Sequence, residues 1–192
     1  VRTVVFQQVL KSLPAQVLQV TPKTFSLSLF QFRPGSLLGD ATLSPDSVAR
    51  FESLEGVEAV YPEVTLDVPM GAKGGGRLFG RRMYTDLFAA GMEPALVRDE
   101  LGKAAKQFVD PGKDADYIPV LVSERLLTLY NSHVADTIAK PRVNSDALRD
   151  FRFTLVLGRS YMMGEHKKGV REVEARIVGV SNRAFLMGVT MP

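Results

Sequence analysis

A short apolar run that leads directly into a helical pattern is the strongest feature of the chain. Residues 119–122 are consecutively apolar, which predicts a buried strand. From Leu126 to Ile138 apolar side chains recur at every fourth position, so they lie on one face of a helix. Ser123 stands between the two segments and is expected to cap the helix by accepting a hydrogen bond from a free backbone N–H.

Two segments near the C-terminal end alternate between apolar and polar positions with the period of a β-strand. Residues 151–157 carry Phe or Leu at every second position, and residues 173–180 alternate in the same way. The connection between them, residues 158–171, has a charged, glycine-bounded centre. We therefore predict a half-buried hairpin with a solvated connection.

The N-terminal part of the chain predicts a helix and a strand. Residues 4–13 place apolar side chains at helical spacing, and Pro14 ends this pattern. Residues 25–32 alternate like one strand, whose second face becomes apolar at Phe30 and Phe32. That face is either covered by the fold or exposed as a contact surface, and the sequence leaves both alternatives open.

A second helix start is well marked. Ser44, Pro45 and Asp46 supply a capping side chain, a proline at the first helical position and an acid in the first turn. Gly56 ends this helix, and residues 57–61 follow as an alternating strand. Helix, glycine and strand together predict the second half of a β-α-β unit.

A long hairpin is predicted over residues 66–90. Its tip is expected at the glycine-rich residues 71–76, the most flexible point of the chain. A phosphate-binding loop needs Gly-Lys followed by Ser or Thr at the start of a helix, whereas Arg77 follows Gly76 here and both flanks are predicted strands. We therefore do not expect nucleotide binding at these glycines.

Basic and aromatic side chains gather around this predicted tip. They are Lys73, Arg77, Phe79, Arg81, Arg82 and Tyr84. Such a group suits RNA, through stacking and phosphate contacts, or an anionic membrane surface, and it is also typical of a solvated loop.

The composition is that of a folded domain. Of the 192 residues, 45% are hydrophobic and 23% are charged, which is enough for a core and argues against disorder. The net charge of +3 does not by itself indicate a nucleic-acid partner. The absence of cysteine excludes disulfides, thiolate chemistry and Cys-zinc sites. Because the chain begins at Val1 rather than Met, we expect it to be a processed or excised piece.

The residue types that carry catalysis or hold metals form no recognisable pattern. The histidines are His133 and His166, and neither has a His, Asp or Glu partner at metal-ligand spacing. Ser132, His133 and Asp136 are close in sequence, but adjacent residues on a helix point about 100° apart and build no catalytic relay. We therefore expect no catalytic activity, no metal and no cofactor.

Several short motifs follow one another in a characteristic order. They are Leu54-Glu55-Gly56-Val57-Glu58-Ala59-Val60, Gly91-Met92-Glu93-Pro94, Pro119-Val120-Leu121-Val122-Ser123-Glu124-Arg125-Leu126 and Ala175-Arg176-Ile177-Val178-Gly179-Val180. This order, with the N-terminal helix and the long hairpin, resembles the MacB-like periplasmic core domain. That domain lies between the first two membrane helices of FtsX/MacB/LolC-type ABC transporter permeases. The resemblance covers nearly the whole chain.

The resemblance implies a particular α+β fold. A β-α-β (porter-like) subdomain would be built from both chain ends, residues 1–68 and 118–192, with an inserted β-rich subdomain at residues 69–117. Residues 4–13 would extend the first membrane helix, and residues 188–192 would return to the second.

The resemblance also implies a function. The chain would be a non-catalytic domain on the extracytoplasmic side of the cell membrane. It would couple ATP-driven motion of membrane helices to export or handover of a lipid, lipoprotein or peptide, or to an envelope partner. Expected partners are a cytoplasmic ABC ATPase, reached through the membrane helices, and a second permease copy. No nucleic acid is expected.

We assign candidate contacts within this interpretation and keep one alternative. The candidates are Phe30, Phe32, Lys73, Arg77, Phe79, Arg81, Arg82 and Tyr84. The alternative is a free-standing domain that binds nucleic acid or another anionic polymer through residues 73–82, with an affinity that falls steeply with salt.

Overall fold

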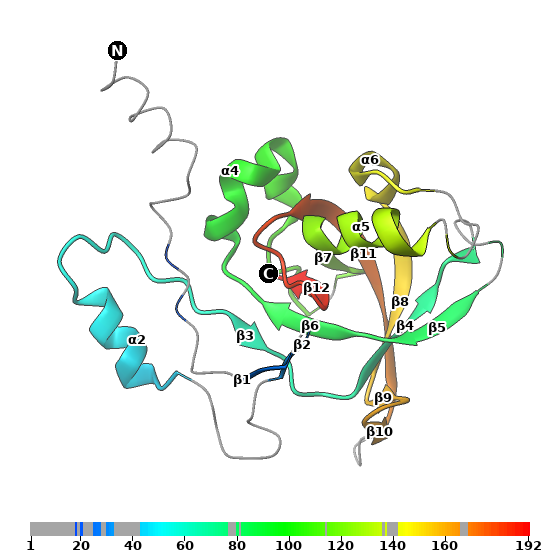
Figure 1. Ribbon diagram of the computed structural model, residues 1–192, viewed down its shortest axis with the longest axis horizontal. Helices are drawn as coiled ribbons and strands as arrows, with labels where there is room; N and C mark the ends of the chain where they lie inside the picture. Colours follow the sequence, from blue (N-terminus) through cyan, green and yellow to red (C-terminus); the bar gives the residue numbers. More distant parts are fainter. Residues whose placement is uncertain are drawn as a thin grey trace. The chain divides into compact units, whose positions relative to one another are not determined.

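The computed structural model describes most of the chain. The described residues are 18, 20, 25–27, 30–32, 43–76, 80, 82–113, 115–135, 137, 142–165 and 169–192, with the backbone alone at 25–27, 30–32 and 165. The helix predicted at residues 4–13 lies outside them. The chain separates into two compact units, Val1–Val60 and Tyr61–Pro192, which we describe one at a time (Figure 1).

The first unit contains a short hairpin where one strand was predicted. Strands β1 (Phe25–Leu27) and β2 (Phe30–Phe32) are antiparallel, with Phe25 opposite Phe32. The prediction of a single strand over residues 25–32 is therefore wrong. Alternation gives the same pattern in one long strand and in two arms that pair with each other, so it cannot distinguish them.

Helix α2 (Pro45–Glu52) confirms the predicted helix start. The Ser44 hydroxyl accepts a hydrogen bond from the Ser47 N–H at 3.2 Å, and Pro45 occupies the first turn. The strand predicted at residues 57–61 is wrong, because these residues, all described, form no strand. Val57 and Tyr61 are 39% and 40% exposed, so their alternation does not mark a face buried in a sheet.

The second unit is built on one eight-stranded sheet. Its strands are β3 (Val64–Thr65), β4 (Met70–Gly74), β5 (Met83–Asp86), β6 (Phe88–Gly91), β7 (Ile118–Ser123), β8 (Arg152–Leu157), β11 (Arg171–Ser181) and β12 (Gly188–Met191). Their order across the sheet is β3-β6-β12-β7-β11-β8-β4-β5. β11 pairs parallel with β7 and antiparallel with β8, so the predicted C-terminal hairpin is confirmed.

The long hairpin predicted at residues 66–90 is confirmed over residues 64–91, and its strands form both edges of this sheet. β3 pairs with β6 at one edge and β4 pairs with β5 at the other. Since β3 leads into β4 and β5 leads into β6, the hairpin reaches from one edge to the other, and the sheet curls (Figure 1). Hydrogen bonds from the Leu66 N–H to the Ala89 carbonyl (2.9 Å) and from the Leu87 N–H to the Met70 carbonyl (3.0 Å) continue the pairing.

The predicted position of the hairpin tip is wrong for residues 71–74. These residues form part of β4, which lies between β5 and β8. Gly71 is buried there, and a Cβ atom at this position would lie 2.3 Å from the Tyr84 hydroxyl oxygen. Glycine is required at residue 71 by the close approach of this ring, and it does not mark a flexible turn.

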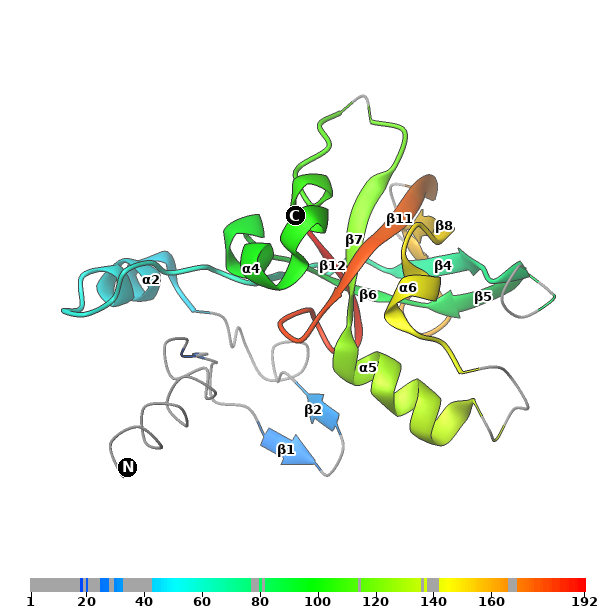
Figure 2. The ribbon, with the colours of Figure 1, turned by 90° about the horizontal axis from the view of Figure 1, so that it is seen from above.

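Both faces of the sheet carry an apolar cluster. One cluster contains Val120 together with Met70, Leu155 and Ile177. The other contains Leu121 with Phe108, and the segment η2 (Pro94–Val97), α4 (Arg98–Leu101) and η3 (Gly102–Gln107) contributes to it. Adjacent residues of β7 thus point to opposite faces, and the segment that contains α4 covers one of them (Figure 2).

The predicted strand-to-helix connection is confirmed, but its capping bond is not. β7 leads directly into α5 (Glu124–Leu129), which continues as a π-helical turn, η4 (Tyr130–Val134). Ser123 is 1% exposed, pairs with Ser181 of β11 and makes no capping bond. Its hydroxyl oxygen is buried without a hydrogen-bond partner among the described residues. Ser123 therefore ends the strand inside the sheet.

The architecture is mixed α+β, as predicted. The helical elements are short, and the remaining one, α6 (Ser145–Leu148), precedes β8. The predicted division into residues 1–68 with 118–192 and an insertion at 69–117 stays a prediction. β4, inside the predicted insertion, pairs directly with β8 of the predicted core.

Candidate contact site

The structure describes only some of the side chains predicted to make contacts. Those of Phe30, Phe32, Arg77, Phe79 and Arg81 lie outside the described residues, although the backbones of Phe30 and Phe32 belong to β2. The described ones are Lys73, Arg82 and Tyr84.

Lys73 and Tyr84 face each other across β4 and β5. They are paired in the register of the two strands, so their side chains share one face of the sheet. The Lys73 ammonium forms an ion pair with Glu172 of β11. Lys73 is thus already neutralised by a carboxylate, which weakens the case for a nucleic-acid surface at residues 73–82. Arg82, just before β5, is exposed.

Tyr84 joins the edge of the sheet to a small projecting hairpin. That hairpin consists of β9 (Arg159–Ser160) and β10 (Gly164–Glu165), which pair antiparallel. The Tyr84 hydroxyl donates a hydrogen bond to the Arg159 carbonyl at 2.8 Å, and its ring meets the Tyr161 ring edge to face, with centroids 4.8 Å apart. Burial, followed by the negative charge of Asp86, raises the pKa of Tyr84, so the hydroxyl remains the donor.

Asp86, at the end of β5, organises the turn between β9 and β10. Its carboxylate accepts hydrogen bonds from the Tyr161 N–H (2.7 Å), the Met162 N–H (2.8 Å) and the Ser160 hydroxyl (2.9 Å). The Ser160 oxygen in turn accepts from the Met162 and Met163 amides, each at 3.1 Å. Burial raises the pKa of Asp86, but these donors outweigh it and hold the pKa below its ordinary value.

This turn presents three consecutive large side chains to solvent. Tyr161 is 79% exposed, Met162 is 75% exposed and Met163 is 47% exposed. In Figure 1 the β9–β10 hairpin extends beyond the ends of β8 and β11. Sequence reasoning did not single out Asp86, Ser160 or this turn. The available signal was the apolar triplet inside an otherwise polar connection.

The polar face of β8 and β11 is held by paired charges. Arg152 pairs with Glu174 at 2.6 Å, and the Arg176 Nε donates to the Asp150 carboxylate at 2.8 Å. Both guanidinium groups lie over the Tyr117 ring, 5.7 Å and 5.2 Å from its centroid. The hydrogen bond to Asp150 raises the pKa of Arg176. These contacts stabilise the sheet through cation–π and charge-assisted interactions.

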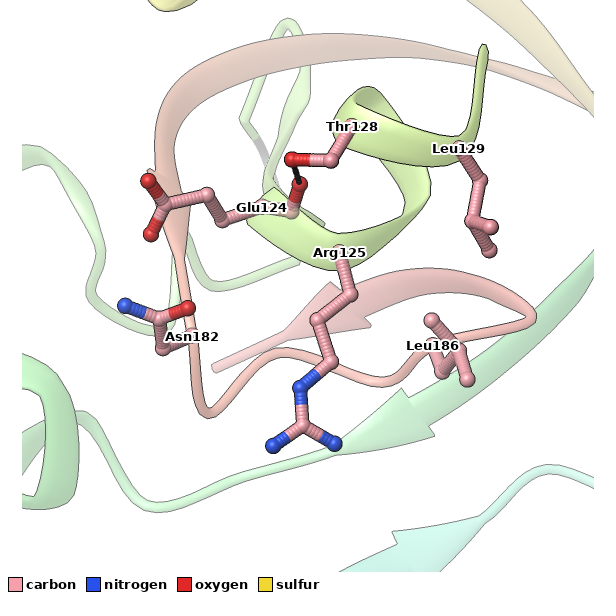
Figure 3. A pocket seen from close by; sticks show the side chains of 6 residues that line it. All are labelled: Glu124, Arg125, Thr128, Leu129, Asn182 and Leu186. Atoms are coloured by element: carbon pink, nitrogen blue, oxygen red, sulfur yellow. Dashed lines mark hydrogen bonds between the residues drawn. The ribbon is translucent and has the colours of Figure 1, made fainter. Parts of the chain in front are cut away.

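A shallow surface hollow of about 540 Å³ lies beside α5 (Figure 3). It is lined by Glu124, Arg125, Thr128, Leu129, Asn182 and Leu186. In Figure 3, Leu129 and Leu186 lie at one end, and Glu124 and Asn182 lie at the other. The Thr128 hydroxyl donates to the Glu124 carbonyl at 3.0 Å. The hollow is open to solvent, and the charged side chains that line it are Glu124 and Arg125.

Two kinds of feature, a metal site and a membrane-spanning helix, are missing from the described part of the chain. No three His, Cys, Asp or Glu side chains among these residues are grouped so that they could hold a metal ion. Within the same residues, no helix combines the length and apolar character needed to cross a bilayer.

The fold and the contact site together define a mixed α+β module that presents a braced surface turn. The chain belongs to the family of probable transporter periplasmic core domains (PCD-like), whose sequence model matches residues 34–189. This confirms the resemblance to the MacB-like periplasmic core domain of ABC transporter permeases. No curated protein matches the chain. The protein is therefore an extracytoplasmic domain of a transporter, on the periplasmic side of its membrane.

Proposed function

We propose that this domain couples ATP-driven motion of the membrane helices of an ABC permease to export or handover of a lipid, lipoprotein or peptide, or to an envelope partner. The domain itself would be non-catalytic, and a cytoplasmic ATPase would hydrolyse the ATP. The observation that carries the proposal is the family match over residues 34–189, which includes the complete sheet of the second unit apart from the last residues of β12.

The construction of the second unit suits the transmission of motion. The sheet is continuous, and each face has its own apolar cluster, so a displacement applied to one strand moves the others with it. Polar contacts also link α4 to the end of β11. The Arg183 Nε, two residues after β11, lies 3.4 Å from a Glu100 carboxylate oxygen, and the Ser181 hydroxyl donates a hydrogen bond to the same carboxylate. A stiff body of this kind can transmit a two-state conformational change of the membrane helices to a partner.

The finer features of the proposal are the porter-like arrangement, the subdomain division and a symmetry-related second copy. Its contact surfaces are the Phe30/Phe32 face and the group formed by Lys73, Arg77, Phe79, Arg81, Arg82 and Tyr84. Tyr84 supports the second surface, because it connects this group to the projecting β9–β10 hairpin through the Arg159 carbonyl.

A topology measurement on the full-length protein tests the location on which the proposal depends. Reporter domains that are active only outside or only inside the cytoplasm would be inserted at Gly112. Gly112 is exposed and lies in a connection between secondary-structure elements, where its φ is 71°. We expect activity from the extracytoplasmic reporter. Activity from the cytoplasmic reporter alone would refute the proposal and would make salt-dependent nucleic-acid binding the next measurement.

A charge reversal tests the coupling. Arg82→Glu, in the proposed contact surface, is compared in the full-length transporter with Arg98→Glu, which changes another exposed arginine at the start of α4. We expect the first variant to reduce substrate-dependent stimulation of ATP hydrolysis and the second to leave it unchanged. Equal behaviour of the two variants would remove Arg82 from the proposed surface.

A further inference from the structure

The three residues at the turn between β9 and β10, which we name the 161–163 tip, are exposed although they are large. Tyr161 and Met162 are more than 70% exposed, and Met163 is 47% exposed. Among the large hydrophobic residues that the structure describes, only Leu18, at 88%, is more exposed than Tyr161 and Met162. A contiguous apolar group on the surface of a soluble unit is a signal of an interaction site.

The tip is held in its exposed conformation by the fold. The Asp86 carboxylate binds the amides of Tyr161 and Met162, and the 6% exposed Ser160 hydroxyl binds those of Met162 and Met163. The edge-to-face contact with Tyr84 fixes the Tyr161 ring. These contacts prevent the turn from folding its apolar side chains back onto the sheet. A side chain ordered in advance loses less entropy when it binds.

The shape of the tip favours binding to a lipid surface over binding to a protein partner. Three side chains at a two-stranded turn present far less area than the roughly 800 Å² per partner that a stable protein interface buries. The tip projects, so it offers no groove into which a segment of another protein would fit. A lipid surface accepts a projecting apolar turn directly, because the side chains displace headgroups instead of filling a preformed pocket.

The chemistry of the tip also matches a lipid interface. Tyrosine is enriched at the level of the headgroups, where its ring is in apolar surroundings and its hydroxyl in polar ones, and methionine is flexible and apolar. Among the side chains of this connection that the structure describes, the charged ones are Arg159 and Arg171, and both are basic. Such an excess of positive charge attracts anionic lipids.

We propose that the 161–163 tip inserts Tyr161, Met162 and Met163 into the headgroup region of an anionic lipid surface. The tip would thereby fix the orientation of the domain relative to the bilayer. The inference rests on the proposed function, which places the domain beside the outer face of a membrane.

The absence of cysteine from the chain makes a direct measurement simple. Met163→Cys and Met187→Cys variants of the chain are labelled with an environment-sensitive fluorophore. Met187 is a matched control, because it lies between β11 and β12 and is 49% exposed, against 47% for Met163. Vesicles contain either phosphatidylcholine alone or phosphatidylcholine with phosphatidylglycerol.

We expect the label at residue 163 to shift to the blue with phosphatidylglycerol vesicles and the label at residue 187 to remain unchanged. In sedimentation with the same vesicles, the Met162→Ser/Met163→Ser double variant should bind at least about tenfold more weakly, because the apolar side chains that enter the interface are removed. The shift at residue 163 should fall as the salt concentration rises.

Three outcomes would overturn the inference. The first is that the fluorescence of the label at residue 163 does not shift with either vesicle. The second is that the fluorescence shifts equally at both labelled positions. The third is a shift that depends on protein concentration without lipid, which would assign the tip to a second copy of the chain. None of these results bears on the topology of the full-length protein. If the tip does not insert but the extracytoplasmic reporter is active, the proposed lipid insertion is refuted and the proposed function is not.

Discussion

The close packing of Tyr84 over Gly71 gives the sharpest prediction of this structure. In a Gly71→Ala variant the new Cβ would lie 2.3 Å from the Tyr84 Oη, 2.4 Å from its Cζ and 2.7 Å from its Cε2. These distances are too short for any real contact, so the ring must move. Its movement would break the hydrogen bond to the Arg159 carbonyl and the edge-to-face contact with Tyr161.

The magnitude follows from the interactions that are lost. Forcing an extra carbon into a packed site costs about 1–3 kcal/mol, and the lower end, about 1 kcal/mol, applies here because the obstructing atoms belong to a side chain that can move. Loss of one hydrogen bond adds about 1 kcal/mol and loss of the aromatic pair about 1 kcal/mol. We therefore expect Gly71→Ala to lower the free energy of unfolding by about 3 kcal/mol, which corresponds to a fall in Tm of about 10 °C for a unit of this size.

A double-mutant cycle separates this explanation from a backbone effect at Gly71. In a Tyr84→Ala background the obstructing ring is absent, so Gly71→Ala should cost less than about 1 kcal/mol, and the coupling energy should be about 2 kcal/mol. Urea unfolding followed by circular dichroism measures all four proteins. Gly91→Ala is the control, because the nearest atom to its new Cβ is 3.7 Å away. An undiminished cost of Gly71→Ala without the Tyr84 ring would refute the reasoning.

Three further predictions follow from other parts of the second unit. A Cβ at Gly188 would lie 1.9 Å from the Phe88 carbonyl oxygen, so Gly188→Ala should separate β12 from β6 and lower Tm more than Gly71→Ala, with no rescue by side-chain removal. Because the folded pKa of Asp86 is lowered, its stabilising effect is complete above the ordinary value of about 4 and is lost as the pH falls below it. Urea titrations between pH 7 and pH 3 should therefore show a steeper loss for the wild type than for Asp86→Asn. The side chain of Asn131 donates a hydrogen bond to the Val143 carbonyl at 2.6 Å and accepts one from the Val143 N–H at 2.8 Å. Asn131→Ala should therefore speed hydrogen exchange of the Val143 amide about tenfold or more. Unchanged exchange would show that these two hydrogen bonds do not hold this connection.

The elements that the sequence predicted correctly are those whose signals are local. The cap of α2 depends on Ser44 and Pro45, which adjoin the helix they begin. The hairpin of β8 and β11 follows from alternation within each strand, and the strand-to-helix connection at β7 follows from an apolar run and a four-residue spacing. Propensity, capping and periodicity act over a few residues, so they can be read without knowing the neighbours in space.

The wrong predictions all depend on which strand lies beside a segment. Residues 57–61 alternate like a strand but do not form one, and Gly71 lies inside β4 although glycines suggested a turn. Ser123 had the right residue type for a helix cap, but it is buried in the sheet opposite Ser181. Long-range pairing decides such cases, since it determines where a backbone group or side chain finds its partner.

By itself, the sequence determined the membership in a transporter domain family, the mixed α+β class and the strands and helices that carry local signals. Only the tertiary structure decided that one hairpin forms both edges of a curled sheet. It also brought Asp86 to the amides of Tyr161 and Met162, which lie 75 and 76 residues further along the chain. The physical reason is that a carboxylate stabilises whichever N–H groups the fold brings within about 3 Å, and no local pattern records that distance.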